Sequence, residues 1–387
     1  CSSDLRSTSV PLPTLILRMS SLSAQFANLN MADASSVASA ASDMKSVAAL
    51  CEHLAAQISL TGKGDSDAIK AAAAAFETLA NNHIVIAEPF ITANFTKLIN
   101  AANNKDKSIR EAVTSAVKAF AAKMSPDNAR AMLPLLFSAS KGEGLQGGVA
   151  FNVRVLALNT ISSMSENAPE QLGFTLPSVV PELTISMSDP KKDVAKAAHD
   201  ALVSVCDVIG NRDIEHMTAK IVRSIVVPAD TPEIMHDLAG VTFVQSVKSP
   251  ALAMVVPLLL RGLRSTLTAT RRQSAVIIDN MSKLVDDPID AAPFLPTLLP
   301  DLEKAAEAMS DPEARKVAER ATTQLKRLKD ECDAALKGTK FANVEEIQKA
   351  LAAKIGKGYN EIHLKHVASM MCSLMELRFF EEEQWSE

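Results

Sequence analysis

The chain has 387 residues, a formal net charge of −5, and 47% hydrophobic but only 4% aromatic residues. A core of Ala, Leu, Val, Ile and Met suits closely packed helices and disfavours a large β-sandwich, which needs more aromatic and β-branched bulk. The acidic balance excludes a generally basic nucleic-acid binder, so any RNA contact must be a local patch.

The beginning of the chain differs in character from the rest. Residues 1–30 are rich in Ser, show no helical periodicity and start with Cys1, so we expect a disordered or non-native extension before Met31. The five cysteines are far apart and form no CxxC pair, which predicts a reduced, cytoplasmic protein. No apolar run reaches the roughly 18 residues of a membrane span, so we expect no membrane partner.

A proline-bearing apolar helix, a polar turn and a second apolar helix recur along the chain. The prolines of this pattern are Pro134, Pro181, Pro257 and Pro300, with gaps of 47, 76 and 43 residues. The gap of 76 residues corresponds to two units of 38 residues. The helix of the series that falls within this gap, at 214–226, has no proline. Two helices in every 40 or so residues are typical of HEAT and armadillo repeats.

The turns and the second helices agree with this reading. Asp189-Pro190 and Asp311-Pro312 each place a helix-capping Asp before a Pro suited to the first helical turn, and the turn at 104–108 does the same without Pro. The second helices carry apolar residues at helical spacing. These positions are Ile109, Val113, Ala116, Val117 and Phe120 in one helix, and Val194, Ala197, Ala198, Ala201, Leu202 and Val205 in another.

The predicted fold is therefore all-α: a solenoid of HEAT-type repeats over residues 31–332, followed by a partial helical bundle at 341–387. The bundle would hold helices at about 344–355 and 360–380, after a linker at 337–340. The repeats are placed at about 36–82, 85–124, 129–166, 174–210, 214–248 and 252–287, with a further pair at 291–330.

The stretch Ser274–Pro288, SAVIIDNMSKLVDDP, resembles the HEAT region of translation elongation factor 3. The segments 211–215, 256–263 and 311–315 are similar to that family too. Near the end, Leu377–Glu381 and Trp385 look like the start of the family's helical bundle. Family members continue into two ABC-type ATPase cassettes that this sequence does not contain, which indicates a fragment or truncated form.

The resemblance implies ribosome binding in the cytoplasm during elongation. The whole factor would couple ATP hydrolysis to release of deacylated tRNA from the exit site, while its HEAT arm contacts rRNA and ribosomal proteins, chiefly at the small-subunit head. Other elongation factors are further possible partners. The alternative is a HEAT scaffold that binds proteins, of the ribosome-associated kinase activator, transport receptor or phosphatase scaffold type.

The sequence offers no site for chemistry. It has no GxxxxGK[ST] loop, and the one cluster of potential ligands, Glu361, His363 and His366, has no visible further ligand. We therefore predict no enzyme activity, no catalytic residue, no small-molecule substrate, and no metal or cofactor in this chain. ATP would belong to the absent cassettes.

Basic residues give the candidate contact surface. No Asp or Glu occurs from Leu238 to Ile278, while Arg261, Arg264, Arg271 and Arg272 gather at one edge of one repeat. Arginine suits bidentate phosphate contacts, although compensation of a helix C-terminus and plain solvation are the alternative roles. Equivalent turns of other repeats carry further cations that would extend a basic stripe, namely Lys105, Lys107, Lys191, Lys192, Arg315 and Lys316.

Overall fold

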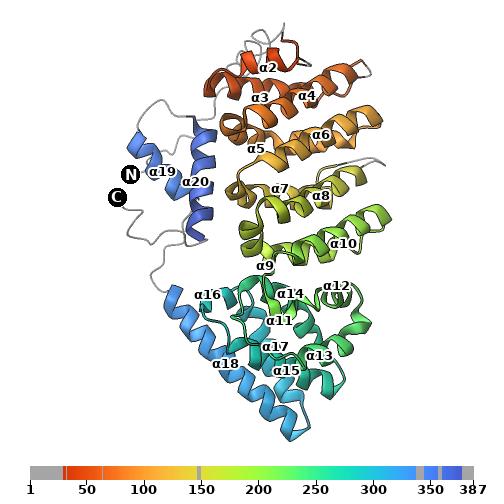
Figure 1. The fold of residues 1–387 in the computed structure, drawn as a ribbon, viewed down its shortest axis with the longest axis vertical. Coiled ribbons are helices and arrows are strands. Elements are labelled where there is room, and N and C mark those ends of the chain that lie inside the picture. Colours follow the sequence, from red (N-terminus) through yellow and green to blue (C-terminus); the bar gives the residue numbers. More distant parts are fainter. Residues whose placement is uncertain are drawn as a thin grey trace, which may run out of the picture. The chain divides into compact units, whose positions relative to one another are not determined.

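A computed structural model describes residues 29–31, 33–62, 64–145, 150–336, 344–355 and 360–376. All regular secondary structure in these ranges is helical, which confirms the predicted all-α class (Figure 1). No helix within them is both long enough and apolar enough to cross a membrane. The residues form two compact units, described separately below.

The first unit holds four long helices that pack as two repeats. They are α3 (Met44–Ile58), α4 (Ser66–Asn82), α5 (Ile84–Asn100) and α6 (Lys107–Lys123), preceded by the short α2 (Ala34–Ala40). First helices pack on each other, α3 against α5, and second helices pack likewise, α4 against α6. This pairwise stacking is the expected HEAT arrangement, and it confirms the sequence reading of these two repeats.

Helix caps and an apolar stripe explain the α5–α6 repeat. The Asp106 carboxylate accepts a hydrogen bond from the backbone N–H of Ser108 at 2.9 Å and so caps α6, as the turn sequence predicts. All five apolar positions predicted for α6 are buried, and the ring of Phe120 lies 6.0 Å from that of Phe95 on α5. Burial of this stripe stabilises the pair.

The second unit continues the alternation of first and second helices. Its long helices are α7 (Ala129–Lys141), α9 (Pro169–Ser186), α10 (Lys192–Cys206), α14 (Ser249–Leu263), α15 (Thr268–Ser282), α17 (Leu295–Ala308) and α18 (Pro312–Leu336). Helix α8 (Phe151–Asn167) lies mostly in this unit, and the short α16 (Pro288–Ala291) precedes α17. First helices again meet first helices, α14 against α17, and second helices meet second helices, α15 against α18.

The repeating prolines lie inside the first helices, as predicted. Pro134, Pro181, Pro257 and Pro300 interrupt α7, α9, α14 and α17. Helix α5 adds Pro89, which lies 45 residues before Pro134 and extends the series into the first unit. Each proline lacks a backbone N–H and removes one helical hydrogen bond, which bends the helix that carries it.

The fifth repeat departs from the expected helix pair. It consists of α11 (Arg212–Glu215), α12 (Thr218–Val226), a 3₁₀ turn (Pro228–Asp230) and α13 (Thr231–Ala239), followed by a non-helical stretch at 240–248. As a result α9 contacts α14 directly: a Cβ on Gly173 of α9 would lie 3.4 Å from Pro250 of α14. Pro228 lies two residues after the end of α12 and begins the 3₁₀ turn, which explains why that helix does not continue.

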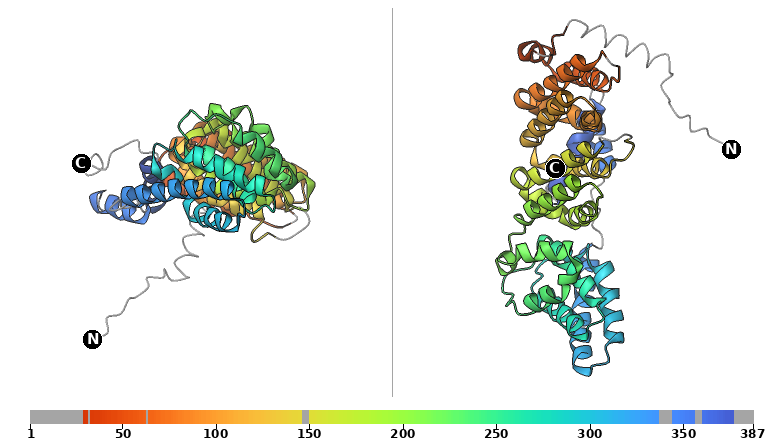
Figure 2. Two further views of the ribbon diagram at one scale, coloured as in Figure 1. Left: turned by 90° about the horizontal axis from the view of Figure 1, so that it is seen from below. Right: turned by 90° about the vertical axis from the view of Figure 1, so that its right-hand side faces the viewer.

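Two helices follow the repeats, α19 (Val344–Ile355) and α20 (Glu361–Glu376), close to the bounds predicted for them. Residues 1–28 of the extension predicted at 1–30, the linker at 337–340 and the aromatic residues Phe379, Phe380 and Trp385 lie outside the described residues. Figure 2 shows the same helix order from two further directions.

The four described cysteines, Cys51, Cys206, Cys332 and Cys372, are buried. Burial raises the pKa of the Cys206 thiol to about 12, so this residue acts as a small apolar side chain.

Candidate nucleic-acid interface

Arg261 holds the end of a neighbouring helix. Its two terminal guanidinium nitrogens donate to the carbonyl oxygens of Ser224 at 2.6 Å and Ile225 at 3.1 Å, in the last turn of α12. These carbonyls have no partner within their own helix, so the contact is a C-terminal cap. Partial burial lowers the pKa of Arg261, but the guanidinium stays charged.

Arg271 binds the backbone of the turn that precedes its own helix. Its Nε donates to the carbonyl oxygen of Ser265, six residues earlier. Arg315 makes the same contact to Met309, at 2.7 and 3.0 Å, and Arg110 reaches the carbonyl of Asn104 at 3.0 Å. In all three turns an arginine binds the carbonyl oxygen of the residue six positions before it. Arg110 was not among the basic contacts predicted from the sequence.

Arg264 and Arg272 are more exposed and pair with acids of the following repeat. Arg264 lies 2.6 Å from the carboxylate of Asp301, and Arg272 lies 3.1 Å from that of Glu313. Exposed ion pairs of this kind contribute only about 0–1 kcal/mol. Their guanidinium groups can therefore exchange these partners for phosphates at little cost.

The lysines of the predicted stripe are all exposed. Lys192 and Lys316 form no ion pair with any residue that the structure describes, whereas Lys107 lies 3.4 Å from Glu111. Lys191 precedes α10 as its N-cap residue. Lys105 and Lys107 belong to the first unit and the other predicted contacts to the second, so one continuous stripe stays a prediction.

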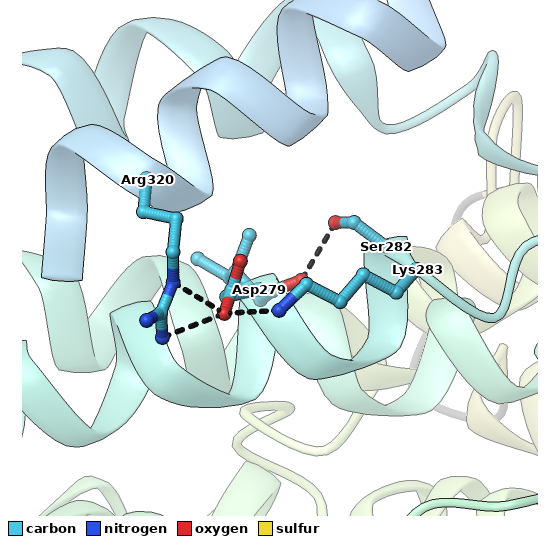
Figure 3. A network of polar contacts seen from close by, with 5 residues as sticks. Asp279, Ser282, Lys283 and Arg320 are labelled. Carbon is cyan, nitrogen blue, oxygen red and sulfur yellow. Dashed lines mark hydrogen bonds and ion pairs between the residues drawn. The ribbon is translucent and has the colours of Figure 1, made fainter.

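A buried carboxylate, which our sequence analysis did not single out, connects α15 to α18 (Figure 3). Asp279 is fully buried, and its Oδ2 accepts from Lys283 Nζ at 2.7 Å and from Arg320 Nε and Nη2 at 2.9 and 2.8 Å. Arg320 follows Asp279 by 41 residues, which is one repeat. The sequence contains a signal for this contact, because Asp279 lies on the apolar face of a second helix. A buried acid at such a position needs a cation from the neighbouring helix.

Other polar contacts also join neighbouring repeats, at separations of 35 and 41 residues. Arg154 of α8 pairs with Asp189, and Lys141 of α7 lies 3.0 Å from Glu182 of α9. The expectation that Asp189 caps α10 is therefore wrong. Asp189 lies two residues before the N-cap residue Lys191. One of its carboxylate oxygens accepts from the backbone N–H of Lys191 at 2.8 Å, and the other binds Arg154.

The fifth repeat leaves an open groove of about 670 Å³ beside α11, α12 and α13. Arg212, His216 and Lys220 line it from α11–α12, and His236 and Asp237 line it from α13. Its stretch at 240–248 is held by polar side chains: Asp213 Oδ2 accepts from the backbone N–H groups of Val244 and Gln245, each at 2.8 Å. Our sequence analysis did not predict this groove.

Two family models match the chain. Residues 30–202 match the "EF3 N-terminal HEAT repeat", and residues 230–336 match the "Elongation factor 3/GNC1 HEAT repeat".

Curated relatives point the same way. The chain is 38% identical over 262 residues to elongation factor 3 of Phytophthora infestans, covering 68% of this chain and 25% of that protein. Identity to elongation factor 3 of Mycosarcoma maydis is 34% over 342 residues, which cover 84% of this chain and 31% of that protein. Identity to elongation factor 3B of Saccharomyces cerevisiae is 33% over 307 residues, which cover 77% of this chain and 29% of that protein. The chain thus spans between a quarter and a third of the length of these relatives.

Matches among solved structures include a designed armadillo repeat protein in complex with the peptide (KR)4. It is 14% identical, and the match covers 70% of this chain and 98% of that protein with a TM-score of 0.25. An engineered protein is 15% identical over 95% of this chain and 96% of its own, with a TM-score of 0.27. Scores this low add nothing to the fold assignment, which rests on the helices. From the two family models and the sequence relatives, the chain belongs to the elongation factor 3 HEAT-repeat family.

Proposed function

We propose that this chain is the ribosome-binding HEAT-repeat arm of an elongation-factor-3-like translation factor. The observation that carries the proposal is identity of 33–38% to three proteins named elongation factor 3 or 3B, over 68–84% of the chain. The partners would be rRNA phosphates and ribosomal proteins, with the small-subunit head foremost and other elongation factors as further contacts. The site of action would be the cytoplasm.

In this proposal the ATPase chemistry lies outside the chain. The whole factor would use ATP in its ABC cassettes to promote release of tRNA from the exit site. Both family models that match here are HEAT-repeat families. We therefore expect the isolated chain to hydrolyse ATP no faster than a buffer blank, in the presence or absence of ribosomes. ATP hydrolysis that co-purifies with the chain through two columns would contradict this expectation.

The cations best suited to ribosome contact are those that the fold does not need. Arg261, Arg271 and Arg315 hold backbone carbonyls, so replacing them would disturb the repeats themselves. Arg264 and Arg272 bind the carboxylates of Asp301 and Glu313 and no backbone carbonyl, and Lys192 forms no ion pair with a described residue. These three side chains of the second unit can be tested without loss of structure.

The experiment is co-sedimentation of the chain with ribosomes across 50–200 mM salt. The triple variant Arg264→Glu, Lys192→Glu and Arg272→Glu should bind about tenfold more weakly than the wild type, with a shallower salt dependence. The matched control replaces Lys326, Arg327 and Lys329 of α18 with Glu, which makes the same change of charge at ion-paired cations outside the predicted stripe. Equal binding by both variants, with unchanged circular dichroism, would reject this surface.

A protein-binding scaffold is the second candidate. It is favoured by the match of residues 230–336 to a family that pairs elongation factor 3 with GNC1. A scaffold of this kind would keep its ribosome or partner contacts after RNA is digested, and its affinity would depend weakly on salt. Binding to protein-free rRNA with a steep salt dependence supports the elongation-factor arm instead.

A further inference from the structure

The buried carboxylate of Asp279 binds two cations at a single oxygen. Lys283 Nζ lies 2.7 Å from Oδ2, and Arg320 Nε and Nη2 lie 2.9 and 2.8 Å from the same atom (Figure 3). The other oxygen, Oδ1, is buried and accepts no hydrogen bond from any residue that the structure describes. One carboxylate neutralises one cation, so the cluster of Asp279, Lys283 and Arg320 keeps an excess positive charge.

This excess is not needed to compensate a buried acid. Asp189, whose side chain is only 11% exposed, forms an ion pair with one described cation, Arg154, and Glu313 likewise pairs with Arg272. A single cation therefore suffices for an acid that joins two repeats. The second cation at Asp279 has no such structural explanation.

Both cations of the cluster also face solvent. The side chain of Lys283 is 46% exposed and that of Arg320 is 57% exposed, whereas Asp279 is 0% exposed. Because their nitrogen atoms are hydrogen-bonded to the same oxygen, they lie close enough together to bind one further anion. Each side chain has N–H groups that Asp279 does not use. An anion on the solvent side would also relieve the repulsion between the two positive charges.

The neighbouring side chains of α15 and α18 extend the site in one direction. Lys316 is exposed one helical turn before Arg320 and forms no ion pair with a described residue. Glu319 is exposed too, but successive residues of a helix point about 100° apart, so it lies on another face than Arg320. Asp286, exposed in the turn after α15, is the acid that opposes binding, since no ion pair joins it to Lys283. Cations one turn apart suit a strand with several phosphates better than one isolated phosphate group.

We infer that Lys283 and Arg320 together bind one phosphate group of an RNA strand, and that Asp279 is the residue that positions them. Lys316 contacts a further phosphate of the same strand. The inference deepens the proposed ribosome contact and rests on it, but Lys283 and Arg320 lie outside the basic stripe predicted from the sequence.

The test uses the whole chain and a fluorescein-labelled 12-nucleotide oligouridylate, with fluorescence anisotropy as the readout. Lys283→Gln leaves Asp279 bound to Arg320, so the fold should persist while RNA affinity falls about fivefold. The plot of log affinity against log salt should become less steep by up to about 0.7. Lys304→Gln is the matched control: it makes the same change of charge at an exposed position of α17 and should alter affinity less than twofold.

Three further variants test the geometry of the cluster. Arg320→Lys keeps the charge but loses the planar fork, and should weaken binding about threefold. Asp286→Asn removes the opposing acid and should strengthen binding about twofold. Asp279→Asn adds one net positive charge, which by attraction alone would strengthen binding. Loss of positioning should instead weaken it about threefold. Circular dichroism and urea titration check that each variant is folded.

Four results would count against the inference. No binding of oligouridylate by the wild type, or equal affinities of the Lys283→Gln and Lys304→Gln variants, would overturn it. Tighter binding by the Asp279→Asn variant would remove the positioning role of Asp279. If Lys283→Gln abolished binding of a phosphoserine peptide and left RNA binding unchanged, the cluster would belong to a phosphoprotein partner, and the RNA assignment would be wrong.

Ribosome co-sedimentation separates this inference from the proposed function. If the wild type and the Lys283→Gln variant sediment equally well, the inference about the cluster fails and the proposed function stands. If the wild type does not sediment with ribosomes, the proposed function fails, and the oligonucleotide assay still decides whether the cluster binds RNA.

Discussion

The α5–α6 repeat and the fifth repeat use similar lengths of chain in different ways. Helices α5 and α6 have 17 residues each and bury aromatic side chains, Phe95 and Phe120 among them. The fifth repeat is divided into helices of 4, 9 and 9 residues. The first arrangement is held by a continuous apolar stripe, and the second depends in addition on polar side chains that bind the backbone.

The difference follows from hydrogen bonding. A continuous helix satisfies its own N–H and C=O groups, except at the ends, so its outer surface presents only side chains. An interrupted segment leaves backbone groups without partners. In the fifth repeat the side chains of Asp213, Asn211 and Gln245 supply hydrogen-bond partners for such groups. The same interruption leaves a groove where a stacked helix would have been.

The largest effect is expected in the apolar stripe. Phe120→Ala should lower the free energy of unfolding of the first unit by about 3–5 kcal/mol, because it removes a fully buried ring that packs on Phe95. Urea titration followed by circular dichroism measures the loss. Phe120→Leu should cost much less, since most of the buried volume is kept. Equal losses for the two variants would show that packing of the ring is not what stabilises this repeat.

Removal of Arg320 should have the next largest effect. Arg320→Ala leaves the buried carboxylate of Asp279 with Lys283 alone, which should cost about 2–3 kcal/mol. The variant with both Asp279→Asn and Arg320→Ala should lose less than the sum of the two single variants, because no buried charge remains. Additive losses in this double-mutant cycle would contradict a coupled pair.

The polar contacts of the fifth repeat should be weaker and more local. Asp213→Ala frees the N–H groups of Val244 and Gln245 and should cost about 1 kcal/mol. Hydrogen exchange should speed up at 241–247, while the amides of α5 and α6 keep their protection. If Asp213→Ala destabilises the protein as much as Phe120→Ala does, the contrast between the two repeats is wrong.

The smallest effect is a pH dependence. Burial raises the pKa of the Cys206 thiol to about 12, whereas an unfolded thiol ionises near pH 8.5. Between these values the unfolded state loses a proton that the folded state keeps, so stability is full below pH 8.5 and falls as pH rises. From pH 8 to 9 the loss should reach about 0.5 kcal/mol, measured by urea titration. Cys206→Ala should remove that part of the slope, and an unchanged slope would count against it.

Much of the fold could be predicted from the sequence because it depends on local spacing. The prolines, the capping acids and the apolar positions of α6 and α10 fixed helix order and bounds to within a few residues. The candidate site was less predictable. Of the four arginines at the α14–α15 turn, Arg261 and Arg271 bind backbone carbonyls, which charge patterning cannot distinguish from exposed cations.

The sequence by itself determined the repeat class and the period, because an amphipathic helix records which of its faces is buried. The family was indicated by the resemblance of particular stretches, Ser274–Pro288 above all. Only the tertiary structure decided that α9 meets α14 directly, that Asp189 binds Arg154, and that a groove opens at Arg212. These contacts join residues from different helices, and their geometry depends on how the helices pack, which no local pattern in the sequence encodes.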